Sequence, residues 1–359
     1  MVHWNGATVK NLFKKSGNQG RSDSAFLKKI YRKLLGRDTD PEGKKYYLRF
    51  LEQGRSRIDV VLDIIESEEF KNKTARENLH HLYLPSIRNE KPDQYKQGQD
   101  FLENSPIWVF QVRDDSDFDW LEEKIIQNGY YEKPGVWNFE INEDTKILSD
   151  LTSQFDPECV LDLGCANGTV MKCLHDAGIQ SDGIEISRLY SSKAFPEIKE
   201  NIIIADILDV DLEKKYDFIL GLDIFEHLNP NKLSLYIQKI FKLLTKSGHL
   251  FCNIPAFGKD EVFGEIFPIY IKEWKKDLKK NNLFHTIHTD DYGYPKNGHL
   301  INAGSGWWVN QFQAQGFRRE KDTEKNLHSK YDKAMEKIST ARKSYYLFSK
   351  NPKKASTLK

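Results

Sequence analysis

The chain has 359 residues and a formal net charge of +1, with 54 lysines and arginines against 53 aspartates and glutamates. This length suggests about two domains, and a content of 39% hydrophobic and 30% charged residues excludes a globally disordered chain. The sequence has no apolar run of the ~20 residues that span a bilayer, no apolar N-terminal signal and no CxxC spacing. We therefore expect a cytoplasmic protein with reduced cysteines and no membrane span, and the balanced charge argues against a general nucleic-acid binder.

The N-terminal part of the chain has the pattern of a small helical domain. Residues 1–22 contain basic residues and no acidic ones, and we expect a flexible basic arm there. Across residues 23–84, apolar side chains recur at helical spacing in three stretches. Asp40 and Pro41 supply an N-cap and a first helical residue for the second helix, and Ser56 precedes the third. A small all-α domain is therefore predicted.

This segment resembles a bacterial family of helical domains of uncharacterised function. The resemblance rests on the stretch LLGRDTDPEG and on the later positions Gly54, Ser56 and SEEF. Domains of this kind often precede enzymes that act on carbohydrate or occur in surface-associated proteins. The resemblance implies a biological context and not a chemistry.

Residues 85–134 are interrupted by prolines and are predicted to be a connector. Within them, the acidic stretch DDSDFDWLEE has the composition of a helix N-terminus, where the helix dipole favours carboxylates. We prefer a solvated helix end over a metal site for this stretch.

From residue 135 to residue 350 the sequence has the alternating pattern of an α/β domain. The short aliphatic runs CVLDLG, DGIEI, NIIIAD, YDFILGLD and GHLFCNIP are predicted strands, with helical stretches after Gly168, around Tyr190 and over 231–244. Strands that alternate with helices form parallel sheets, and such sheets bind ligands beyond the carboxyl ends of their strands. Residues 351–359 are predicted to be a basic tail.

Polar or glycine residues follow four successive predicted strands. The loop Asp162–Gly168 follows the first strand and contains glycines that let the backbone turn tightly and approach a ligand. Glu185 follows the second strand and is suited to accept hydrogen bonds from both hydroxyls of a ribose. Asp206 ends the third strand, placed to receive an adenine amino group, and the segment 221–228 ends the fourth. The Gly164-x-x-x-Gly168 spacing does not match the dinucleotide-binding pattern, which disfavours a nicotinamide-dependent oxidoreductase.

Together these motifs resemble class I S-adenosylmethionine-dependent methyltransferases. VLDLGCANG, GIEIS, IIADI and LDIFEHL match the signature of the broad group that methylates small molecules and glycans. The resemblance implies a Rossmann-like, doubly wound, mostly parallel seven-stranded sheet and S-adenosyl-L-methionine as the cofactor. One departure is Ala166, which stands where glycine is usual and should shift the loop slightly.

The resemblance also implies roles for individual residues. In the first loop, Gly164, Cys165, Ala166 and Gly168 would pass under the methionine part of the cofactor, with Asp162 near its ammonium group. Glu185 would hold the ribose. The residues expected to frame the adenine are Ile186, Asp206 and Ile207. Those expected to lie beside the sulfonium are Leu222 and Asp223.

Histidines are the candidate general bases for a hydroxyl acceptor. His227 follows the expected sulfonium site directly and is the first candidate, with a purely structural histidine as the alternative. The histidine-rich stretch 285–299 is predicted to be a loop that covers the substrate, with His299 or His288 as second-choice base. A metal site in this stretch is disfavoured, because polar loop clusters are common without an ion, and no metal ligand is predicted.

The sequence favours a sugar or glycan hydroxyl as the methyl acceptor. The fourth strand is followed neither by an Asn/Asp-Pro-Pro-aromatic motif nor by a Pro-Cys nucleophile, which disfavours a flipped base as substrate. A small natural product or a phenolic hydroxyl is the alternative acceptor, and a non-catalytic interaction module is the alternative from another class. A predicted helical face of Phe267, Ile271, Trp274 and Leu278 carries lysines beside it, which suggests a solvated basic face or a site for an anionic substrate.

Overall fold

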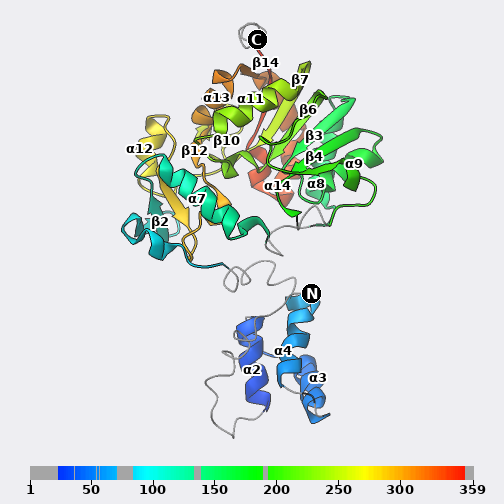
Figure 1. The fold of residues 1–359 in the computed structure, drawn as a ribbon, viewed down its shortest axis with the longest axis vertical. Helices are drawn as coiled ribbons and strands as arrows, with labels where there is room; N and C mark the ends of the chain where they lie inside the picture. The colour runs from blue at the N-terminus through cyan, green and yellow to red at the C-terminus, as the bar shows by residue number, and fades with distance from the viewer. Residues whose placement is uncertain are drawn as a thin grey trace. The chain divides into compact units, whose positions relative to one another are not determined.

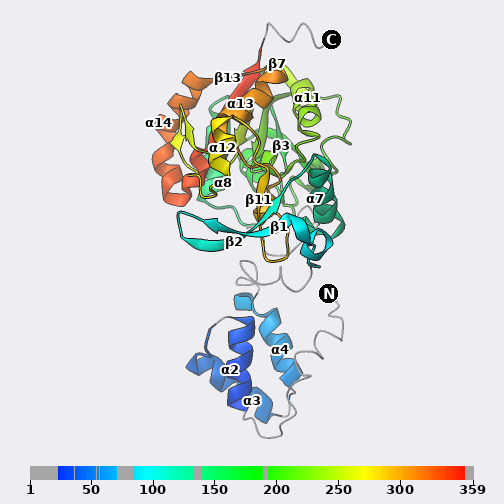
Figure 2. The same ribbon diagram turned by 90° about the vertical axis from the view of Figure 1, so that its left-hand side faces the viewer.

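The computed structural model divides the chain into two compact units, shown as ribbons in Figures 1 and 2. The first unit comprises Met1–Leu82 with Pro134–Trp137, and the second comprises Tyr83–Lys133 with Asn138–Lys359. The structure describes residues 23–35, 37–53, 55, 57–70, 84–132, 139–188 and 193–351. The predicted arm, the helix around Tyr190 and the tail beyond residue 351 lie outside these residues.

The first unit contains the three predicted helices, α2 (Asp23–Leu34), α3 (Pro41–Glu52) and α4 (Arg57–Glu66). Asp40 caps α3, because its Oδ1 accepts a hydrogen bond from the backbone N–H of Gly43 at 2.7 Å. The apolar faces of the helices meet in one buried cluster formed by Leu27, Ile30, Tyr31, Leu34, Leu35, Tyr47, Val60, Val61, Ile64 and Phe70. The helical prediction for this segment is confirmed.

The second unit is built on a seven-stranded sheet with the order β13-β14-β7-β6-β3-β4-β5. These strands are β3 (Cys159–Leu163), β4 (Gln180–Glu185), β5 (Ile202–Ile204), β6 (Tyr216–Leu222), β7 (Leu244–Asn253), β13 (Phe317–Arg319) and β14 (Tyr345–Lys350). From β7 to β5 all neighbours are parallel, and β14 is antiparallel to both β7 and β13. The predicted mostly parallel sheet is confirmed.

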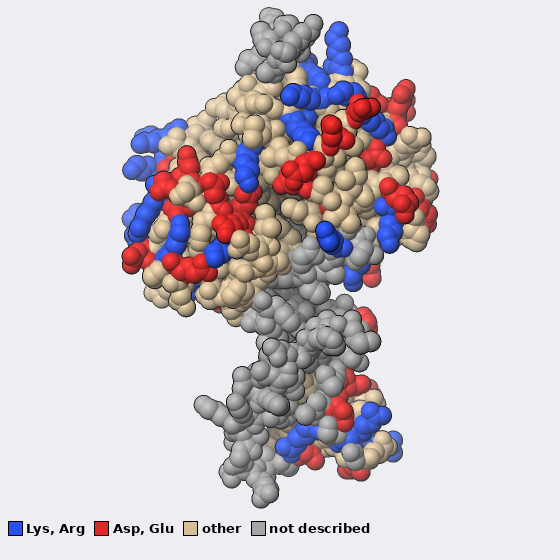
Figure 3. Space-filling model, viewed as in Figure 1, with Lys and Arg blue, Asp and Glu red and all other residues tan. Residues whose placement is uncertain are grey.

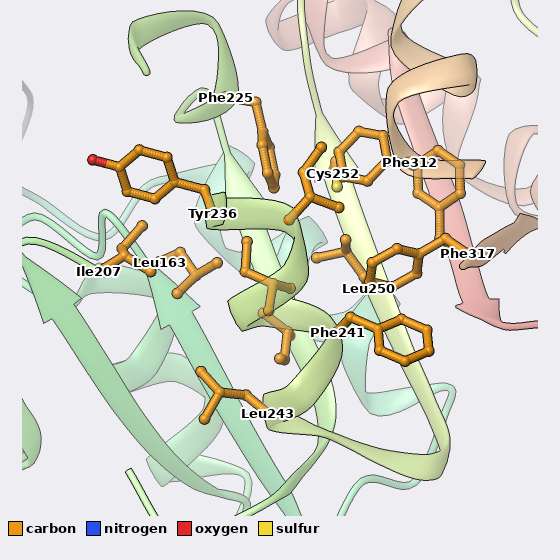
Figure 4. Packing of buried hydrophobic residues seen from close by; sticks show 14 of the residues in the cluster. Leu163, Ile207, Phe225, Tyr236, Phe241, Leu243, Leu250, Cys252, Phe312 and Phe317 are labelled. Atoms are coloured by element: carbon orange, nitrogen blue, oxygen red, sulfur yellow. The ribbon is translucent and has the colours of Figure 1, made fainter. Parts of the chain in front are cut away.

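The side chains of the central strands alternate between two hydrophobic clusters, one on each face of the sheet. On β14, Tyr345 and Leu347 belong to one cluster and Tyr346 and Phe348 to the other. One face is covered by α11 (Leu233–Leu243) and α13 (Ser305–Ala314), whose packing is shown in Figure 4. The other face is covered by α8 (Glu143–Ser153), α9 (Thr169–Asp176) and α14 (Lys321–Ile338). Burial of both faces explains why the strands are aliphatic throughout.

The segment predicted to be a connector forms part of the second unit. It contains β1 (Tyr95–Asp100), β2 (Ser105–Gln111) and α7 (Ser116–Gln127), and β2 pairs with β11 (Thr286–Thr289) from much later in the chain. The acidic stretch indeed begins a helix. This small antiparallel sheet gave no clear sequence signal, because β2 finds its second partner only in the folded chain.

Short elements complete the second unit. Besides single 3₁₀ turns, they are β8 (Ala256–Phe257), β9 (Lys259–Asp260), β10 (Gly264–Glu265), β12 (Ala303–Gly304) and α12 (Trp274–Lys279). The predicted helical face over 267–278 is therefore wrong in part. Phe267 and Ile271 precede the helix and make isolated β-bridges to Phe257 and Asp100 instead.

Charged side chains of both signs are interspersed on the surface of the second unit. On the face shown in Figure 3, lysines and arginines alternate with aspartates and glutamates over the described residues. In the part of the chain that the structure describes, we find no helix with the length and apolar character needed to cross a membrane.

A buried ion cluster ties β13 and α14 to the loop around β9. The guanidinium of Arg319 donates to both carboxylate oxygens of Asp260 at 2.9 Å and to Glu324 at 2.9 Å. The three side chains are at most 2% exposed. Each charge depends on the others, because an unpaired buried ion loses its hydration without compensation.

We expect Arg319→Met to lower the free energy of unfolding of the second unit by about 3–5 kcal/mol, because it leaves two buried carboxylates without their cation. Urea denaturation followed by tryptophan fluorescence measures this loss. Adding Asp260→Asn and Glu324→Gln to the variant should recover part of the stability. If Arg319→Met unfolds at the same urea concentration as the wild type, the cluster does not support the fold.

Candidate active site

The residues at the carboxyl ends of β6, β3 and β4 lie along one edge of the sheet, because these strands are parallel neighbours. The loop Asp162–Gly168 leaves β3, Glu185 ends β4 and Asp223 follows β6. The topology therefore brings the predicted cofactor residues of three strands together.

The loop after β3 turns through three residues in the left-handed backbone region. Gly164, Ala166 and Gly168 have φ values of +68°, +50° and +78°. A side chain at Gly164 would place its Cβ 2.9 Å from Ile224, and one at Gly168 would come within 2.5 Å of Ile198. Both glycines are thus required by backbone conformation and by space. Ala166 adopts a conformation that costs a non-glycine residue roughly 1 kcal/mol.

Glu185 links this loop to the neighbouring strand end. Its Oε2 accepts a hydrogen bond from the backbone N–H of Ala166 at 2.8 Å, and its Oε1 accepts one from Ser187 at 2.7 Å. The first bond offsets part of the strain at Ala166. A carboxylate accepts hydrogen bonds and cannot donate them when ionised, which is the property that a ribose hydroxyl would need at this strand end.

Asp162 is a buried carboxyl group close to Glu185. Burial, and secondly the negative charge of Glu185, raise the pKa of Asp162 to about 7. Two carboxyl groups at adjacent strand ends disfavour each other's ionisation. A cationic ligand at this edge would relieve that repulsion.

The structure places the other predicted cofactor residues in different surroundings. Asp206 accepts hydrogen bonds from the backbone N–H of Leu208 at 2.7 Å and from the hydroxyl of Tyr236 at 2.8 Å. Ile186 is 43% exposed, whereas Ile207 is buried in the hydrophobic core under α11. Only the backbone of Ile207 is thus available to frame an adenine.

The two remaining predicted cofactor residues contact the hydrophobic core. Cys165 is buried against Met171, and Leu222, at the end of β6, packs against the other core cluster. The roles of these residues stay predictions.

Asp223 is held by a partly buried network that the sequence did not reveal. Its backbone lies in the left-handed region at φ +52°, and its carboxylate accepts a hydrogen bond from Arg342. Arg342 also donates to Asp144 on α8 at 2.8 Å and to the side chain of Asn253 at 2.8 Å. The sequence placed Arg342 in a basic C-terminal stretch and gave no sign of this contact, since the two residues are 119 positions apart.

Glu226, His227 and His299 form a compact group that we call the histidine cluster. Their ligand-type atoms all lie within 4.8 Å of one another. The two imidazole rings meet edge to face with their centroids 4.8 Å apart, and His299 Nε2 lies 4.0 Å from Glu226 Oε1. Glu226 and His227 belong to the 3₁₀ turn Phe225–His227 directly after β6, and His299 follows the 3₁₀ turn Lys296–Gly298. The structure thus unites the first base candidate with one of the two second choices.

Burial shifts the pKa values of all three members toward the neutral forms. It lowers the pKa of His227 to about 4, a shift that is opposed in part by the hydrogen bond to the carbonyl of Gly298. It lowers the pKa of His299 as well, with a smaller contribution from His227. Burial and then the charge of Asp223 raise the pKa of Glu226 well above its usual range. The influence of Asp223 shows that the cluster lies beside the end of β6.

His288, the remaining base candidate, lies in another part of the unit. It is a buried residue of β11, and its Nδ1 is 3.0 Å from the hydroxyl of Tyr270. His285 is exposed. The histidine-rich stretch therefore divides between the small sheet and the histidine cluster instead of forming one loop over the site.

The sequence analysis did not identify two members of the site as functional residues, although the sequence around one of them, Glu226, offered a clue. Glu226 stands next to His227 in the sequence, and its charge in an apolar context could have been noticed. Tyr131, whose hydroxyl is 3.4 Å from His227 Nδ1, comes from the segment predicted to be a connector and had no signal. By sequence position, Phe139 or Trp137 is a further candidate for closing the pocket. Trp137 lies outside the described residues, whereas the carbonyl of Phe139 accepts a hydrogen bond from the side chain of Asn167 at 3.0 Å.

We expect the protein without ligand to lose stability as the pH rises from about 4 to about 7, because folded Asp162 keeps its proton up to pH ~7 and the unfolded chain releases it near pH ~4. Asp162→Asn should remove this penalty and raise the free energy of unfolding at pH 8 by roughly 1–3 kcal/mol. Urea denaturation of both proteins at pH 5 and pH 8 measures the difference. The same change at exposed Glu213, to Gln, should have no such effect; an unchanged pH dependence in Asp162→Asn would contradict the assignment.

Comparison with known proteins agrees with this geometry. Residues 143–319 match a family described as a methyltransferase domain, and residues 7–74 match a family described as a domain of unknown function (DUF4214). The first match spans the strands β3 to β7 and all the strand ends described above. The second match contains the three helices of the first unit.

Curated relatives cover the methyltransferase part. The ubiquinone biosynthesis O-methyltransferase of Pelagibacter ubique is 27% identical over 172 residues, which are 44% of this chain and 68% of the relative. The malonyl-[acyl-carrier protein] O-methyltransferase of Anoxybacillus flavithermus is 26% identical over 153 residues, which are 41% of this chain and 57% of the relative. A solved structure of the 1,6-didemethyltoxoflavin-N1-methyltransferase of Burkholderia thailandensis aligns at 12% identity with a TM-score of 0.42, covering 68% of this chain and 96% of that one.

The family matches and the arrangement of the strand ends lead to the same assignment. The chain carries an S-adenosylmethionine-dependent methyltransferase domain, preceded by an N-terminal helical domain of a family whose function is unknown.

Proposed function

We propose that this protein transfers a methyl group to a hydroxyl of a sugar or glycan. The observation that carries the proposal is the partly buried histidine cluster, which follows the strand end where the sulfonium of the cofactor is expected. Uncharged imidazoles at that position are suited to receive the proton that a hydroxyl must lose.

The residues at the sheet edge fit S-adenosyl-L-methionine. Glu185 is a carboxylate at the strand end where the ribose is expected, and the repulsion between Asp162 and Glu185 would be relieved by a bound ammonium group. We assign the ribose to Glu185, the methionine part to the loop Gly164–Gly168, and the sulfonium region to Leu222 and Asp223. When bound, the cofactor supplies a methyl group that is already activated for displacement.

Methyl transfer to a hydroxyl forms an O–C bond as the C–S bond breaks with its electron pair remaining on sulfur. The hydroxyl proton must leave, and His227 or His299 would accept it on a ring nitrogen. His227 is uncharged near neutral pH, since its pKa lies at about 4. The chain's main contribution is to align the hydroxyl with the methyl group, because an in-line displacement depends on geometry.

The acceptor class is proposed from context. Two curated relatives are named O-methyltransferases, which favours oxygen as the methylated atom. The carbohydrate is suggested by the helical domain, which resembles domains that precede enzymes acting on carbohydrate. A small natural product or a phenolic hydroxyl is the alternative, and it is tested in the same experiment.

Glu185→Ala is expected to weaken binding of S-adenosylhomocysteine at least 10-fold, because the ribose loses its acceptor and the loop loses the bond to Ala166. Isothermal titration calorimetry measures the dissociation constant. The matched control is Glu213→Ala, an exposed carboxylate of the same unit, which should bind like the wild type. Equal affinity of Glu185→Ala and the control would remove Glu185 from the ribose site.

Incubation of the wild type with radiolabelled methyl donor and a panel of activated sugars, polysaccharides and phenols should label a sugar hydroxyl, identified by mass spectrometry. His227→Ala should lower the rate by about 10²–10⁴-fold, because the hydroxyl loses its activating group. His175→Ala, at an exposed position on α9, serves as the control. Labelling of nitrogen or carbon would contradict the proposal, and cofactor binding without transfer to any acceptor would favour a non-catalytic module.

A further inference from the structure

We propose that the histidine cluster is a binding site for a divalent transition-metal cation. The ligand atoms would come from Glu226, His227 and His299. The sequence had argued against a metal in this part of the chain. The inference rests on the distances within the cluster and on the buried Glu226 carboxylate, which has no hydrogen-bond partner among the described residues.

The Glu226 carboxylate lacks the partners that a buried acid requires. Its side chain is 1% exposed, and neither oxygen has a hydrogen-bond partner among the residues that the structure describes. The nearest imidazole nitrogen, on His299, is 4.0 Å away, which is too far for a hydrogen bond. Arg342 is engaged with Asp144, Asp223 and Asn253. Buried polar groups without partners are rare in proteins, and a cation between Glu226 and the histidines would satisfy both oxygens.

The contact between His227 and Gly298 bears on which ring nitrogen of His227 can bind an ion. A carbonyl oxygen can only accept, so the contact of 3.2 Å between His227 Nδ1 and the carbonyl of Gly298 requires a proton on Nδ1. The Nε2 atom then carries the lone pair. Donation of the second ring N–H to a backbone carbonyl is the arrangement that commonly fixes metal-binding histidines. Gly298 is needed here, because a Cβ at its position would lie 3.2 Å from His227 Nδ1.

The distances suit one shared ion. Bonds of about 2.0–2.2 Å place the ligand atoms of a tetrahedral site about 3.3–3.6 Å apart. The 4.0 Å between His299 and Glu226 would have to shorten by about 0.5 Å, and the widest pair, within 4.8 Å, by at most about 1.5 Å, which side-chain rotation on ion binding would supply. Two imidazoles and one carboxylate suit Zn²⁺, Mn²⁺ or Fe²⁺ better than Mg²⁺ or Ca²⁺, which prefer oxygen ligands.

A cation at this place has open coordination positions beside the expected sulfonium region. Three protein ligands leave room for an acceptor oxygen, and coordination lowers the pKa of a bound hydroxyl. In the metal-loaded protein the ion takes up the lone pairs of the ligating ring nitrogens, so the base role proposed above for His227 or His299 applies to the metal-free protein, and in the loaded protein the hydroxyl proton passes to water. This role rests on the proposed function, whereas the binding of the ion does not.

The binding test uses the full chain after treatment with a chelator. Zn²⁺ is titrated by calorimetry, and Mn²⁺ by electron paramagnetic resonance, each in the presence of S-adenosylhomocysteine. We expect one ion per chain that is lost in Glu226→Gln and in His299→Ala, with affinity lowered about 100-fold or more. His285→Ala, an exposed histidine of the same stretch, should bind like the wild type. Circular dichroism verifies folding, and Glu226→Asp, which keeps the carboxylate, should retain weaker binding.

Two results would overturn the metal site. One is equal affinity of the wild type and both cluster variants for the ion, and the other is a wild-type dissociation constant above about 1 mM, the upper end for specific sites. Its role is measured separately by methyl transfer of the chelator-treated wild type with and without added Mn²⁺ or Zn²⁺. Binding without stimulation of transfer refutes the role and leaves the metal site. Stimulated transfer to nitrogen or carbon would refute the hydroxyl acceptor and retain the metal.

Discussion

The parallel arrangement of β6, β3 and β4 is the constraint on which the rest of the molecule depends. Parallel neighbours place all their carboxyl ends at one edge of the sheet, so residues from different strands converge there without any contact in the sequence. The arrangement is stable because hydrophobic side chains on both faces are buried under helices, with α11 and α13 on one side and α8, α9 and α14 on the other. Burial of both faces therefore stabilises the parallel sheet, and the parallel sheet in turn brings the site residues together at one edge.

Carboxyl groups that oppose each other's ionisation accumulate at this edge. Asp162 and Glu185 oppose each other's ionisation, and Asp223 acts in the same way on Glu226. Arg342 balances Asp223 and Asp144, while Glu226 has no hydrogen-bond partner among the described residues. A site with this imbalance suits cationic ligands. Both ligands discussed above are cations, a sulfonium cofactor and a divalent metal, and the same electrostatic reason supports each of them.

The segments outside the central sheet supply the side chains that distinguish this site. Tyr131 enters from residues before the sheet, and His299 enters from the long segment between β7 and α13. Both segments are anchored by the small sheet of β1, β2 and β11. The pairing of β2 with β11 keeps His288 buried in the small sheet. His299 comes after β11 in the chain and contacts His227. The histidine cluster is built mainly from these long-range contacts.

The sequence by itself determined the helices of the first unit, the parallel sheet and the strand-end positions of Asp162, Glu185 and Asp223, because helical period, aliphatic runs and turn glycines are local signals. Only the tertiary structure decided that Glu226, His227 and His299 meet, that Arg342 holds Asp223, and that Ile207 points into the core. Those outcomes depend on which strands pair and on where the loops run. The contacting residues are more than 70 positions apart, and a contact over that separation produces no local pattern in the sequence.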